Sequence, residues 1–263
     1  MVLFLFLSHL GLGIVFSLLF VSREAGVKFF RFNAGLAAIL IAVAFAFRPT
    51  ESGLSAERVG FVALVLAEAA VVLYWATVGR ALAAVRPAIA GTACVSGVVA
   101  LVAQALAVAS GWGGTVLALT VASFLSSALF LGVACTAMIL GHWYLVIPSL
   151  HVTHLQSIVK VHIASLAVRL VVVAVAVGVA IGTADPDLGP TFVGYILSVS
   201  GVFFWQRVLF GLAGPTVLSY LTWETAKIRS TQSATGILYV DFFTVVVGEV
   251  LAKYLVLATH VPV

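Results

Sequence analysis

Polar positions interrupt this chain at intervals that predict eight membrane-spanning helices. Between the interruptions, long apolar segments cover residues 2–22, 30–47, 59–80, 87–110, 115–140, 158–182, 192–213 and 231–259. Most approach the ~20 residues that a helix needs to cross a bilayer. Turn-forming stretches rich in glycine, proline or aspartate separate them, as at 48–53, 111–114 and 185–190. Only helices and closed barrels satisfy their backbone groups in lipid, and the sequence has no barrel-like alternation, so an all-α integral membrane bundle is predicted.

Composition supports this class and excludes others. Hydrophobic residues make up 63% of the chain and charged residues 8%, against roughly half and about a quarter in soluble domains. We expect one transmembrane domain over residues 1–263, with the lipid bilayer as its principal partner. The first segment lacks the basic start of a signal peptide and is expected to be a span. Phosphate-binding loops, His-Glu-x-x-His and Gly-x-Ser-x-Gly are absent from the sequence, so a soluble-type catalyst is not expected.

The basic residues predict the orientation of the spans. Eight of the thirteen fall on one set of alternate connections, and two, Arg48 and Arg58, fall on the other. The eight are Arg23, Lys28, Arg31, Arg80, Arg86, Lys160, Lys227 and Arg229. Cytoplasmic loops are enriched in Lys and Arg, so both termini are expected outside the cytoplasm. We therefore attribute the net charge of +4 to the basic residues of the cytoplasmic connections, and nucleic acid is not an expected partner. The expected location is a bacterial cytoplasmic (inner) membrane.

Ionisable residues inside the spans are the first candidate site. Counting ~1.5 Å per residue places Glu68, Arg169 and Asp241 about 14–16 Å from the ends of their spans, near the bilayer midplane. Such groups are costly in lipid and mark functional paths or buried ion pairs. We expect Arg169 to pair with Asp241 or Glu68. Glu249 and Lys253 are four residues apart and are expected to pair locally near the outer interface.

Two further expectations concern the polar residues of the seventh and eighth spans. Asp241 and Glu249 lie ~12 Å apart along a helix axis and could form a polar ladder. Arg207 is expected to extend its side chain to the inner interface. A kink is predicted at 211–215, where Pro215 removes a backbone donor, and the segment from there to Trp223 is expected to lie along that interface.

The histidines are the second candidate site. His142 ends the fifth predicted span and His162 begins the sixth, so both are expected at similar depth and could ligate one b-type haem. With the His-x-x-His pair between them, a transition-metal site is an alternative, its candidate ligands being His142, His162, His151 and His154. The ordinary explanation is that these histidines anchor the chain at the headgroups. His9 and His260, both near the outer side, form a second possible cofactor-binding pair.

Three functions follow from these patterns. The first is an integral subunit of a respiratory or electron-transfer complex that binds haem b, interacts with quinone, or both, and has other subunits as partners. The second is a proton-coupled transporter or channel that uses Glu68, Arg169, Asp241 and Glu249. The third is a cofactor-free structural subunit of a membrane complex. The sequence leaves all three open.

Overall fold

Eight long apolar helical segments form the body of the protein. A computed structural model describes residues 1–50, 53–147, 150–182 and 189–263. Within these ranges no residue is in a β-strand, and eight segments are long and apolar enough to cross a bilayer. The predicted all-α multi-pass bundle is therefore confirmed.

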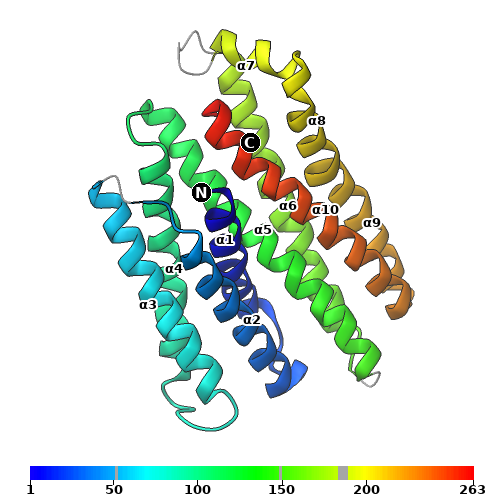
Figure 1. The fold of residues 1–263 in the computed structure, drawn as a ribbon. Helices are drawn as coiled ribbons and strands as arrows, with labels where there is room; N and C mark the ends of the chain where they lie inside the picture. Colours follow the sequence, from blue (N-terminus) through cyan, green and yellow to red (C-terminus); the bar gives the residue numbers. More distant parts are fainter. Residues whose placement is uncertain (51–52, 148–149, 183–188) are drawn as a thin grey trace.

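The helices follow one another with short connections. In chain order they are α1 (Val2–Ser17) with the 3-10 turn η1 (Leu18–Phe20), η2 (Arg23–Ala25), α2 (Gly26–Ala46), α3 (Ser55–Thr77), α4 (Arg86–Val108), α5 (Gly114–Val146), α6 (Thr153–Gly182), α7 (Gly189–Ile196), η3 (Val199–Gly201), α8 (Val202–Val208), the π-helical turn η4 (Leu209–Ala213), α9 (Gly214–Lys227) and α10 (Thr231–Thr259). Successive spans reverse direction, so α1 begins and α10 ends toward the same side of the bundle (Figure 1). We call this side the terminal face and the other the opposite face.

Helix α5 is the centre of the bundle. It contacts α1, α4, α6 and α10, whereas α2 and α3 link α1 to α4 on one flank. On the other flank, α9 packs against both α6 and α10. Helices α6 and α10 both run from the opposite face toward the terminal face (Figure 1). Because α5 and α9 each contact both of them, α6 and α10 share one interior.

Glycines set the close approach of α1 to α5. A methyl group on Gly13 would overlap the carbonyl of Ala128, and one on Gly132 would overlap the backbone of Gly13. Gly11 meets α2 in a similar way, its Cβ position lying 2.7 Å from Ile41 Cγ1. Small residues allow such backbone contact between membrane helices. The buried hydroxyls of Ser17 and Thr136 join the same two helices at 2.5 Å.

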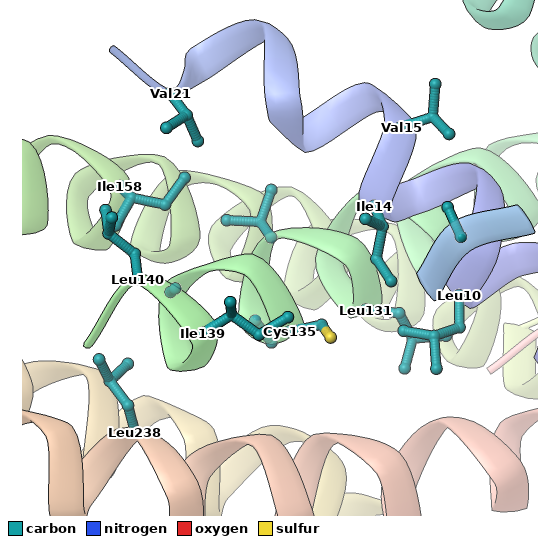
Figure 2. Close-up of a cluster of buried hydrophobic side chains, with 14 of the residues drawn as sticks. Leu10, Ile14, Val15, Val21, Leu131, Cys135, Ile139, Leu140, Ile158 and Leu238 are labelled. Carbon is teal, nitrogen blue, oxygen red and sulfur yellow. The ribbon is translucent and has the colours of Figure 1, made fainter. Parts of the chain in front are cut away.

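An apolar cluster fills the space around this contact. Leu10 and Ile14 of α1 face Leu131 of α5, and Leu238 of α10 approaches α5 from its other side (Figure 2). These side chains are at most 6% exposed. Packing between helices is a main source of association in lipid, where no hydrophobic force drives helices together. The cluster therefore fixes α5 between α1 and α10.

Helices α5 and α6 are longer than predicted. Their 33 and 30 residues correspond to about 50 and 45 Å, more than the ~30 Å of a hydrocarbon core. The predicted boundaries are 140 and 158, whereas α5 continues through His142 and α6 already includes His154. Tyr144 holds the two helix ends together, since its hydroxyl donates to the His151 carbonyl (2.6 Å) and accepts from the Leu155 N–H (3.1 Å).

The seventh span also differs from the prediction. Helical structure is disturbed at the expected place, where η4 precedes Gly214 and Pro215. The expectation that the following segment lies along the interface is wrong, because α9 continues the span to Lys227 and packs on α6 and α10. Pro215 stands in the first turn of α9, directly after the π-helical turn, which is a position where a helix tolerates proline. The predicted break at Asp185-Pro186-Asp187 lies outside the described residues.

Candidate functional site

Two polar layers lie inside the bundle between α6 and α10. One, the histidine layer, consists of His162 and Asp241. The other, the arginine layer, is built around Arg169 and Glu249. Along α6 the layers are seven residues apart and along α10 eight, which is about 10–12 Å on both helices. Because the helices are parallel, both layers form at matched height, with the arginine layer closer to the terminal face.

Glu249 is the common acceptor of the arginine layer. Its Oε1 accepts from Arg169 Nε and from Arg207 Nη2, both at 2.9 Å. Its Oε2 accepts from Arg169 Nη2 at 3.2 Å and from the Ser127 hydroxyl at 2.5 Å. Lys253 Nζ lies 3.9 Å from the same oxygen. The three cations and the carboxylate are all at most 2% exposed, so these contacts replace solvation by water.

Further hydrogen bonds hold the cations of this layer in place. Arg169 Nη1 donates to the Ser123 hydroxyl at 2.8 Å, and Nη2 donates to the Val263 carbonyl at 3.2 Å. Lys253 Nζ donates to Ser127 Oγ at 2.6 Å. Ser127 therefore accepts from the lysine and donates to the carboxylate. Charges buried in this way are tolerated only where such hydrogen bonds accompany the ion pairs.

Arg207 lies on α8, just before the π-helical turn η4, and its side chain reaches the arginine layer. The residue is fully buried, so the expectation that it extends to the interface is wrong. Its guanidinium lies over Gly211 of η4 and Gly248 of α10, and a methyl group on Gly211 would overlap it. Among the described residues, Arg207 Nε and Nη1 have no hydrogen-bond partner. The side chain is thus held between two glycines with only one of its donors paired.

The histidine layer has fewer residues and fewer hydrogen bonds than the arginine layer. His162 Nε2 lies 2.7 Å from Asp241 Oδ2, and both side chains are at most 1% exposed. The two atoms are not aligned as a hydrogen bond, and within the described chain neither Asp241 oxygen has another partner. The imidazole lies parallel to the Phe130 ring at 5.4 Å. We therefore interpret the pair as a close polar contact in which both carboxylate oxygens of Asp241 can still accept a hydrogen bond.

Polar groups continue from the arginine layer to the terminal face. His9 of α1 is fully buried and lies within electrostatic reach of Lys253 and Glu249. It also approaches Gln104 of α4, although in the described structure neither side chain has a hydrogen bond of good geometry. Gln104 lines a cavity of about 80 Å³ at the terminal ends of α1, α3 and α4, together with Gly60. Unsatisfied polar groups thus extend from the interior toward this cavity.

The predicted pairing of Arg169 is wrong in its partner. The arginine binds Glu249, whereas Asp241 lies one layer away with His162. Glu68 is on α3, which packs on α2 and α4, and it is half-buried. In the described structure its Oε2 has no hydrogen-bond partner. The expected local pair of Glu249 with Lys253 exists, and it is fully buried within a larger network of ion pairs.

The structure does not bring His142 and His162 together. His142 is exposed and its Nδ1 lies 2.8 Å from the Tyr239 hydroxyl, whereas His162 contacts Asp241. Tyr239 and Asp241 are two residues apart on α10, about 200° around the helix. The two histidines therefore lie against different sides of α10, an arrangement that does not favour one shared haem.

The remaining histidines have separate neighbours. His151 is bonded to the Thr153 hydroxyl at 2.8 Å, and His154 pairs with Glu24 at 2.7 Å. His260 is exposed and stacks on Trp112 at 4.5 Å, whereas His9 is inside the bundle. Among the described residues, no three His, Cys, Asp or Glu side chains are grouped as metal ligands. The candidate metal set, His142, His162, His151 and His154, thus receives no geometric support.

Three residues of the arginine layer were missed by sequence reasoning. Arg207 is one of the three basic residues, with Arg169 and Lys253, that are not assigned to a connection between spans, and it could have been grouped with Arg169 on that ground. Ser123 and Ser127 are four residues apart on α5 and share one helix face. Serines are common in apolar helices, so this spacing alone did not indicate a site.

No known protein family has a sequence model that matches this chain, and no curated protein shows significant sequence similarity to it. The class that the fold defines is therefore a multi-pass α-helical membrane protein. Function must be inferred from the buried polar layers themselves.

Proposed function

We propose that this protein is a proton-coupled transporter or channel whose polar path runs between α6 and α10. The observation that supports this proposal is the stacking of two buried ionisable layers at matched height on parallel helices. Ionisable residues within spans are expensive and commonly belong to proton or ion pathways. His9 and Gln104 extend the proposed path to the cavity at the terminal face.

Buried hydroxyl groups support continuity between the layers. Ser165 lies on α6 between His162 and Arg169, and its hydroxyl donates to the His162 carbonyl at 2.8 Å. Thr244 lies on α10 between Asp241 and Glu249, and its hydroxyl donates to the Asp241 carbonyl at 2.8 Å. Hydroxyls both donate and accept. They provide intermediate positions across a gap of ~12 Å that one proton transfer cannot span.

The two layers have different proposed roles. Asp241 and His162 form the proton-exchanging pair, because each can gain or lose a proton and the carboxylate retains free acceptor capacity. The arginine layer contains three cationic side chains and one carboxylate, an excess of two positive charges. A buried positive charge repels metal cations from a membrane path. The proposed path thus favours protons passed between side chains over hydrated cations.

Replacing Asp241 with asparagine is expected to reduce proton flux at least tenfold. The change removes the titratable group and keeps the size of the side chain. Flux is measured in proteoliposomes with a trapped pH-sensitive dye and an imposed pH gradient. Glu224→Gln, on the exposed surface of α9, is the matched loss of one carboxylate and is expected to leave the flux unchanged. Equal flux through wild type and Asp241→Asn would exclude this residue as the relay.

The redox hypothesis with haem b or quinone remains a prediction from the histidines, and it has its own test. A reduced-minus-oxidised absorbance spectrum of protein in mild detergent reports any bound haem. If His142 and His162 are the ligands, alanine at either position abolishes the haem band. Because the two histidines lie against different sides of α10, we expect His142→Ala to leave the spectrum unchanged. Loss of a stoichiometric haem band in that variant would contradict this expectation.

A further inference from the structure

A second cavity lies at the opposite face, away from the polar layers. It has a volume of about 510 Å³ and is formed where α1, α2, α3 and α4 approach one another. Its wall is largely apolar and includes Leu18, Val27, Phe30 and Ala90. A smaller cavity of about 60 Å³ shares Leu18 and Ala90 and reaches Val71 in the bundle. The wall could therefore accept part of an extended hydrocarbon chain.

Two arginines form the polar part of this cavity. Arg23 and Arg86 both line it, and both lie within electrostatic reach of the Tyr74 phenol. Arg86 Nη2 donates to the Ala81 carbonyl at 3.2 Å, but in the described structure its Nε has no partner. The nearest carboxylate in sequence, Glu24, pairs with His154. Within the described chain, no ion pair of either arginine with a carboxylate is present, so both charges are available to an anion.

We propose that this cavity binds an acidic phospholipid of the surrounding bilayer. The phosphate is held by Arg23 and Arg86, because guanidinium groups bind phosphate oxygens through paired hydrogen bonds. An acyl chain lies along the apolar wall. The site is at the face where eight of the basic residues gather, and basic pockets between membrane helices bind acidic headgroups. It is independent of the proposed proton path, which uses α6 and α10.

The charge requirement is tested by lipid retention. Purified protein is incubated with phosphatidylglycerol or phosphatidylcholine of identical acyl chains, and bound lipid is counted by native mass spectrometry. Wild type is expected to retain phosphatidylglycerol about tenfold better. The double variant Arg23→Gln with Arg86→Gln is expected to lose this preference. Lys28→Gln, an exposed cation nearby that does not line the cavity, is the control and is expected to keep it.

The shape requirement is tested by filling the cavity. Gly91 lines it, and a Cβ added there meets no atom within 4 Å, so Gly91→Leu extends into open space. This variant is expected to reduce phosphatidylglycerol retention about tenfold. Gly178→Leu on α6, equally unobstructed, is the matched control.

Two results would overturn the proposal. One is equal retention of both lipids by wild type. The other is an unchanged preference in the Arg23→Gln variant together with unchanged phosphatidylglycerol retention in the Gly91→Leu variant. Arg86 also bonds backbone carbonyls. If the double variant does not fold, these two single variants decide the question.

Discussion

Glu249→Gln is expected to destabilise the folded protein by about 3–5 kcal/mol, the range observed when one partner of a buried ion pair is removed. The carboxylate is the only anionic side chain that contacts Arg169, Arg207 and Lys253 in the described structure. Glutamine keeps the shape of the side chain but leaves the three cations without a counter-charge. The measurement is the midpoint of thermal unfolding in detergent, converted to free energy with the wild-type unfolding enthalpy.

The control and a comparison make this prediction specific. Glu224→Gln breaks an exposed pair with Lys227 and is expected to change stability by less than about 1 kcal/mol. Arg207→Gln removes one cation from a layer that has an excess of them, so it is expected to cost less than Glu249→Gln. A larger loss for the arginine variant would contradict the view that the shared carboxylate holds this layer together.

Gly132→Ala is expected to destabilise the bundle by about 3 kcal/mol, the upper part of the range for overpacked cores. The added methyl group would overlap the backbone of Gly13, and neither backbone can move without separating α1 from α5. The same unfolding measurement applies. Gly236→Ala on α10 is the control, because a Cβ there meets no atom within 4 Å and alanine favours the helix by about 0.5–1 kcal/mol. Similar effects of both substitutions would argue against a backbone contact as the cause.

The lengths of the helices illustrate a limit of the hydropathy pattern. The pattern gave the correct number of spans, but it ended the fifth at residue 140 and began the sixth at residue 158. The structure extends both by about five or six residues, because Tyr144 and the carbonyl of His151 continue the contact between the helices outside the apolar region. Hydropathy reports where lipid begins, whereas helix ends depend on hydrogen bonds between elements that the pattern does not record.

The candidate site also combines features that the sequence predicts with side-chain contacts that only the packing of the helices decides. Sequence reasoning placed Arg169 and Asp241 near the bilayer midplane, expected Glu249 near the outer interface, and anticipated a ladder from Asp241 to Glu249 along α10. It assigned the wrong partner to Arg169, since depth along a helix does not specify which side chain it meets. It also left Arg207 at the interface, because a π-helical turn beside two close glycines is a property of the packed pair of α10 and η4.

The sequence by itself determined that this protein lies in a lipid bilayer, the number of its spans, and the presence of Arg169 and Asp241 inside them. These properties follow from transfer free energies, which add residue by residue along the chain. Only the tertiary structure decided that Glu249 would be shared by three cations and that His162 would meet Asp241. It also separated His142 from His162. Such pairings depend on the rotation and height of each helix against its neighbours, which are set by contacts as local as Gly13 with Gly132.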